Sequence, residues 1–136
     1  MSTAAHPIQC VVVTPERTLF DETVDFVALP LYDGEVGIGP GRSPLIGRLG
    51  FGEMRTKIAG ETHRYFVEGG FVQVRDNIVT VLTQRAIAAE KIELPAATSE
   101  LDLAKALPST TEVLQDVKAK AIARARAQVR VASKRS

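Results

Sequence analysis

The sequence predicts an all-β domain followed by a pair of helices. Over residues 8–83, short apolar segments alternate with turn residues about every eight to twelve positions, a spacing typical of a sandwich or a barrel. After Arg85 helix formers dominate, interrupted at Leu107-Pro108, where a helix cannot continue. We therefore expect a β domain over residues 1–87 and a helical hairpin over residues 88–136.

Strand patterns fill the first part of the chain. Asp76-Asn77 links the last two expected strands as a two-residue hairpin, since both residues tolerate the left-handed region, and Ala59-Gly60 turns an earlier pair. Such short connections favour antiparallel neighbours. All phenylalanines fall in this part, so we expect an aromatic core there. The expected strands are 8–14, 17–20, 24–31, 35–38, 45–49, 52–58, 62–67, 71–75 and 78–83.

A glycine-rich loop interrupts the strand pattern within residues 26–45. Four glycines break the alternation of apolar side chains, and Pro40 between them and Pro44 after them stiffen the backbone. Its charged side chains are Asp33, Glu35 and Arg42. This composition suits a rigid rim that contacts a partner better than a loop that performs catalysis.

Two helices are expected after the β domain, over residues 95–106 and 111–133. Pro95 suits a first helical position, with Ser99 as an alternative N-cap, and the segment from Ser109 to Glu112 fits a capping box. The second helix carries one apolar stripe. Half of its members are alanines, and burial of each alanine contributes only about 0.8 kcal/mol, so we expect the helix to dock weakly on the β domain. The stripe is Leu114, Val117, Ala121, Ala125, Val129 and Ala132.

Charge is distributed unevenly along the chain. The 136 residues carry a net charge of +1, yet residues 110–136 hold seven Lys and Arg against two acidic residues. The basic helix lacks aromatic residues for stacking on bases, which argues against nucleic-acid binding and favours an acidic protein partner. Neither a membrane-spanning run nor a secretory signal is found, so we expect a cytosolic chain.

Candidate catalytic and metal-binding residues are sparse. His6 and His63 have no partner at ligand spacing, and Cys10 lies in a strand pattern as a small hydrophobe. The glycine-rich loop lacks the Gly-Lys-Ser/Thr ending of a phosphate-binding loop. Acidic residues at 21, 22 and 25 are expected in a solvated turn. The sequence therefore predicts neither an enzyme nor a cofactor or metal site.

Three segments together resemble the epsilon subunit of F-type ATP synthases. They are Leu-Pro-(x)2-Asp-Gly-Glu-Val-Gly-Ile-(x)-Pro-Gly-Arg-Ser-Pro-Leu from Leu29, Phe66-Val-Glu-Gly-Gly-Phe-Val-Gln-Val, and Asn77-(x)2-Thr-Val-Leu. The resemblance implies a β-sandwich of about ten antiparallel strands followed by two antiparallel helices. It also implies a noncatalytic rotor subunit that links the gamma subunit to the c-ring and couples proton or sodium flow to ATP synthesis. Its place would be peripheral, at the cytoplasmic face of a bacterial inner membrane.

The same resemblance implies roles for individual residues. It places the rim against the c-ring and one loop arginine against gamma, and it sets arginines of the last helix against acidic segments of the beta subunits, where they would hinder ATP hydrolysis. The c-ring residues are Asp33, Gly34 and Glu35, the gamma residue is Arg42, and the inhibitory residues are Arg124, Arg126 and Arg130.

Some members of this family bind ATP through an Ile/Leu-Asp-x-x-Arg-Ala motif, which is degenerate here. The ungapped match has Glu93 at the acidic position and no arginine, and a shifted match offers Asp102 with Lys105. Because lysine cannot make the planar two-pronged contact of arginine, we expect very weak ATP binding or none. The alternative to the rotor subunit is a small β-sandwich module that binds a protein or ligand and carries a basic helical tail.

Overall fold

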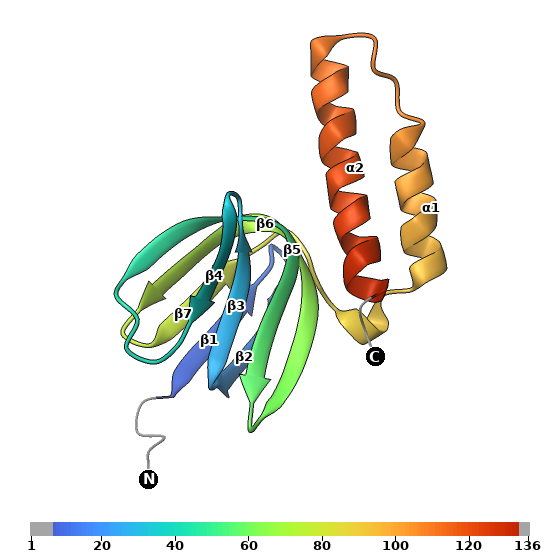
Figure 1. Cartoon of the computed structure of the whole chain (residues 1–136). Helices are drawn as coiled ribbons and strands as arrows, with labels where there is room; N and C mark the ends of the chain where they lie inside the picture. The colour runs from blue at the N-terminus through green and yellow to red at the C-terminus, as the bar shows by residue number, and fades with distance from the viewer. Residues whose placement is uncertain (1–6, 134–136) are drawn as a thin grey trace.

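The computed structural model describes residues 7–133, which form a β domain with a helical hairpin beside it (Figure 1). The predicted fold class, a β-sandwich followed by two helices, is confirmed. The strands are β1 (Ile8–Val13), β2 (Thr18–Val24), β3 (Phe26–Leu31), β4 (Gly34–Ile38), β5 (Leu45–Ile58), β6 (Glu61–Arg75), β7 (Ile78–Leu82) and β8 (Ala86–Ala88).

One sheet folds over itself to make the sandwich. Its order is β2-β1-β7-β6-β5-β3-β4, and β8 pairs with β6. The structure describes eight strands rather than about ten, because residues 45–58 and 61–75, each expected as two strands, are single strands that bend. β1 and β7 pair in parallel, unlike the other pairs. They are distant in sequence, so no tight turn imposes an antiparallel arrangement on them.

The bend in β6 depends on two glycines. Gly69 and Gly70 have φ angles of +69° and +104°, which residues with a side chain rarely adopt. A Cβ atom on Gly70 would lie 1.8 Å from the main-chain oxygen of Leu82 on β7. The turns Asp76-Asn77 and Ala59-Gly60 also have positive φ angles throughout, as their sequences predict.

The sandwich core is aliphatic, and the expected aromatic core is wrong. Side chains of valine, isoleucine and leucine, with Met54 and Cys10, fill the space between the two halves of the sheet. Phe71 is 55% exposed, and Phe66 packs in a separate cluster against the hairpin. Burial raises the pKa of the Cys10 thiol to about 12, which fits the prediction that this residue serves as a small hydrophobe.

A short 3-10 turn, η1 (Ala89–Lys91), leads into α1 (Leu94–Lys105), and α2 (Glu112–Ser133) returns antiparallel to it (Figure 1). The N-cap of α2 is Thr111, whose Oγ1 accepts a 3.1 Å hydrogen bond from the Leu114 N–H, so the expected capping box at Ser109 is wrong. Val117 is 52% exposed, because only the C-terminal half of α2 lies beside the sandwich. The buried residues of α2 are Ala125, Ala127, Gln128, Val131 and Ala132.

We predict that Gly70→Ala lowers the free energy of unfolding by at least about 3 kcal/mol, since the added methyl group must displace backbone rather than a mobile side chain. Urea unfolding followed by circular dichroism measures this. Gly39→Ala is the matched control, because a Cβ there meets no atom within 4 Å. Equal midpoints for the two variants would contradict the proposed role of the bend.

Candidate functional site

The hairpin docks on the sandwich through an apolar cluster built around Phe66. This side chain is fully buried and would be exposed if the hairpin left, at a cost of about 1.5–3 kcal/mol. Docking is therefore firmer than the alanine stripe alone predicts. The other buried members are Ala89, Ile92, Ala97, Ala127, Val131 and Ala132.

A half-buried group of charges borders this cluster. The Arg124 Nε lies 3.6 Å from Oε2 of Glu68, and Nη1 of Arg85 lies 3.9 Å from Oε1 of the same carboxylate. The Arg124 guanidinium also stands 5.5 Å from the centre of the Phe51 ring. In the docked hairpin, Arg124 therefore interacts with the sandwich, and Glu68 supplies the negative charge shared by two arginines.

The rim and the end of α2 meet at a small cavity of about 210 Å³, which we call the rim junction. The sequence predicted these two sets of residues separately. The cavity is smaller than the roughly 300 Å³ at which ligand pockets begin, so it suits a contact between elements better than a small-molecule site. Its lining includes Gly34, Glu35, Glu53, Arg55, Arg130 and Val131.

Hydrogen-bonded charges cross the rim junction from β4 to α2. Arg55 donates from Nη1 to Oε2 of Glu35 at 3.2 Å and from Nη2 to Oε1 at 3.3 Å, and its Nη1 also donates to Oε1 of Glu53 at 3.1 Å. Arg64 donates from Nε to Oε2 of Glu53 at 2.6 Å and from Nη2 to the main-chain oxygen of Val131 at 3.3 Å. The hydrogen bond with Glu35 is the main reason that the pKa of Arg55 is raised.

Sequence reasoning missed this network, although it contained a signal for it. A two-residue turn at Ala59-Gly60 places Arg55 directly opposite Arg64 on the neighbouring strand. Like charges in that position are unfavourable unless a carboxylate lies between them. Glu53, two residues before Arg55 and therefore on the same face of the strand, is the carboxylate that meets this need.

The remaining predicted site residues lie on the surface. Asp33 occupies the exposed turn between β3 and β4, and Arg126 is exposed on α2. Arg42 is exposed in the loop from β4 to β5, next to Gly41, whose N–H donates a 2.8 Å hydrogen bond to Oδ1 of Asn77. That bond ties the loop to the turn between β6 and β7.

The two alternative matches to the ATP motif lie at opposite ends of α1. Glu93 precedes α1, whereas Asp102 and Lys105 lie near its end, about 14 Å or more along the helix axis. His63 is exposed 3.8 Å from Glu61, and His6 lies outside the described residues. Among residues 7–133, no three His, Cys, Asp or Glu side chains gather as metal ligands would.

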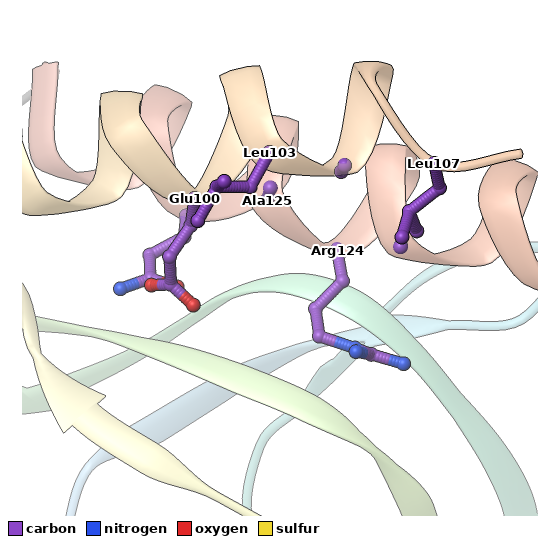
Figure 2. Close-up of a pocket in the computed structure, with 8 residues that line it drawn as sticks. Glu100, Leu103, Leu107, Arg124 and Ala125 are labelled. Atoms are coloured by element: carbon purple, nitrogen blue, oxygen red, sulfur yellow. The ribbon is translucent and has the colours of Figure 1, made fainter.

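A groove of about 230 Å³ separates α1 from α2 near the sheet, and Figure 2 shows its lining. Glu100 extends from α1, while Arg124 points from α2 toward the sandwich. Leu103 beside it is 70% exposed, so the groove opens to solvent. Its charged lining residues are Glu100 of α1 and Arg124 of α2. A carboxylate and a guanidinium, which stays protonated, do not make an acid/base pair for catalysis.

An exposed apolar surface covers the outside of β5, β6 and β7. The exposed fractions of Ile46, Phe71, Leu82 and Ile78 are 77%, 55%, 49% and 46%. Phe71 lies directly opposite Leu82 on β7 and opposite Arg48 on β5, so these side chains share one face of the sheet. We call this surface the outer apolar face. The sequence analysis missed it because it assigned Phe71 to the core.

A family model and individual relatives of this chain agree on its family. Residues 7–89 match the family described as ATP synthase, Delta/Epsilon chain, beta-sandwich domain. The chain is 50% identical over 123 residues to the ATP synthase epsilon chain of Rhodopirellula baltica, covering 90% of this chain and 96% of that one. It is 38% identical over 122 residues to the ATP synthase epsilon chain of Nitratidesulfovibrio vulgaris strain DP4, covering 88% and 91%.

Two solved structures share the fold. A chain in the cryo-EM structure of Euglena gracilis mitochondrial ATP synthase, OSCP/F1/c-ring, aligns with a TM-score of 0.80 at 21% identity and covers 92% of this chain and 81% of that one. A chain in the Tetrahymena thermophila mitochondrial ATP synthase central stalk/c-ring structure aligns with a TM-score of 0.74 at 11% identity, covering 92% and 96%. The second chain therefore matches this one in both the sandwich and the hairpin.

We predict that Glu68→Gln lowers the free energy of unfolding by about 1 kcal/mol, because it leaves two arginines facing each other at a half-buried position. Thermal and urea unfolding measure the change. Glu61→Gln serves as control, since the Glu61 side chain is 79% exposed. If the two substitutions had the same effect, the Glu68 carboxylate would have no special role in holding the hairpin.

Proposed function

Because the chain belongs to the ATP synthase epsilon-chain family, we propose that it is a noncatalytic subunit of the rotating central stalk of an F-type ATP synthase, where it couples ion flow to ATP synthesis. The observation that carries the proposal is the outer apolar face. Exposed apolar side chains that gather on one face of a sheet mark a protein contact more often than a free surface. A rotor subunit requires such a contact, because it must turn with its neighbours.

We assign the gamma subunit to the outer apolar face. Ile46 and Phe71 provide most of the apolar exposure there, on neighbouring strands of a rigid sheet. Arg42 lies in the loop that precedes β5, where it would add a charged contact at the edge of the same interface. Arg48, directly opposite Phe71, adds a charge within the same face, and aromatic and arginine side chains are both enriched in protein interfaces.

The c-ring is assigned to the rim, with Asp33, Gly34 and Glu35 at the contact. These residues are exposed, and Tyr32 beside them is 68% exposed, so the rim presents polar groups together with one aromatic ring. Such a surface suits a contact with polar loops at the membrane boundary. Among residues 7–133, no helix is long and apolar enough to cross a membrane. In this proposal the chain is held at the cytoplasmic face of a bacterial inner membrane by the c-ring.

The helical hairpin is proposed to act as a movable arm that inhibits ATP hydrolysis. Arg126 and Arg130 are exposed in the docked hairpin, whereas Arg124 interacts with Glu68. An extended hairpin would present all three arginines to acidic segments of the beta subunits, which are transient partners. Undocking exposes Phe66, so the docked state has an apolar contribution of about 1.5–3 kcal/mol.

We predict that Ile46→Asp reduces binding to purified gamma by at least about tenfold, since it buries a charge in the apolar contact. Binding is measured by calorimetry or by co-purification after reconstitution. Leu103→Asp is the matched control, because Leu103 is 70% exposed but lies on α1. Retention of gamma by Ile46→Asp would contradict the assignment, and failure of the unmodified chain to bind gamma would contradict the proposed function.

We also predict that Arg126→Glu combined with Arg130→Glu raises ATP hydrolysis by the assembled enzyme about two- to fivefold, as expected for the loss of exposed charge contacts. The increase should shrink at high ionic strength, because salt screens the attraction. Arg17→Glu is the control, since Arg17 is exposed in the turn between β1 and β2 and lies on neither the hairpin nor the outer apolar face. Unchanged hydrolysis at both low and high salt would leave the hairpin with a structural role only.

A further inference from the structure

The last turn of α2 is held by a side chain of the sandwich. Arg64 donates from Nη2 to the main-chain oxygen of Val131, two residues before the helix ends. Carbonyl groups in the last turn of a helix have no partner within the helix, and the negative end of the helix dipole lies there. An arginine bound to such a carbonyl both satisfies the oxygen and complements the dipole.

The position of Arg64 depends in turn on the rim. Its Nε is fixed by Oε2 of Glu53, and the other oxygen of Glu53 accepts from Arg55. Arg55 divides its donors between Glu53 and Glu35, and Glu35 is the exposed end of this series. Three side chains, those of Arg55, Glu53 and Arg64, thus connect the exposed carboxylate of Glu35 to the end of α2.

The balance of charges at the rim junction predicts how a change at Glu35 affects α2. Glu35, Arg55, Glu53 and Arg64 sum to zero, and Arg130 of α2 lines the same junction. If the charge of Glu35 is removed or engaged elsewhere, Glu53 alone faces three arginines. The excess positive charge repels Arg130 and draws Glu53 toward Arg55, which weakens its hold on Arg64. Both effects loosen the last turn of α2.

We propose that Glu35 controls, through Arg55, Glu53 and Arg64, how firmly the last turn of α2 is docked, so that a cationic group of a partner at the rim loosens that turn. The inference rests on the proposed function only in taking the rim as a partner contact. The connection itself is a property of the free chain. Through this connection, a partner that binds the rim would also change how readily the hairpin moves.

Hydrogen–deuterium exchange of the isolated full-length chain tests the proposal. Glu35→Gln should speed exchange of the amides of residues 127–133 about two- to fivefold, the effect of losing one partly exposed ion pair. Exchange in β6 and β7 should be unchanged. Asp33→Asn is the matched control, because it removes a rim charge outside this series and should leave α2 unaffected.

A double-substitution cycle then identifies the route. Arg64→Lys should speed exchange of the same amides, and adding Glu35→Gln to it should produce little further change if both act through one connection. Unchanged exchange in Glu35→Gln, or an equal additional effect in the Arg64→Lys background, would overturn the proposal. Neither result would affect the assignment of gamma, since that assignment is tested by binding at Ile46.

Discussion

The structure depends on a bend that only glycine permits. At Gly70 the backbone of β6 passes so close to β7 that a Cβ atom would lie 1.8 Å from the Leu82 oxygen. Because β6 bends there, one half pairs with β7 while the other pairs with β8, and a single sheet becomes two facing layers. The residues just before the bend face the hairpin. Phe66 packs against α2 and Glu68 meets Arg124, so the bend positions the docking surface as well as the core.

Docking combines a strong apolar contact with weak charged ones. Alanines at 127 and 132 let the backbone of α2 approach Phe66 closely, and burial of that ring contributes about 1.5–3 kcal/mol. In the Arg124–Glu68 pair, which crosses to the hairpin, the arginine is 41% exposed, where an ion pair contributes about 1 kcal/mol or less, while the more deeply buried Glu53–Arg64 pair lies within the sandwich. Charges therefore do not determine whether the hairpin docks at all. They are better suited to adjusting a docked state whose stability comes mainly from apolar burial, and small changes in charge can shift its population.

Local signals were predicted well, and long-range contacts were not. Two turns were evident from Asp76-Asn77 and Ala59-Gly60, because their conformations depend on the residues themselves. The aromatic core was wrong because a phenylalanine in a strand can lie on either face or at a domain boundary, and only the folded sheet decides which. The prediction that the whole apolar stripe of α2 is buried was partly wrong for a similar reason, since the sandwich covers only one half of the helix. Domain boundaries at residue 87 and the partner contacts of Glu35 and Arg42 stay predictions.

The most informative arrangement joins segments that are almost a hundred residues apart in sequence. Glu35 belongs to the rim and Arg130 to the last helix, yet both line one cavity of about 210 Å³. Side chains of alternating charge lie between them. Arg55 and Arg64 stand opposite each other on neighbouring strands, and both donate to Glu53, whose carboxylate offsets the repulsion between the two arginines. The network ends at Arg64 of β6, which donates to the main-chain oxygen of Val131. In the proposal, Glu35 of the rim therefore adjusts how firmly the hairpin is docked, in addition to contacting a partner.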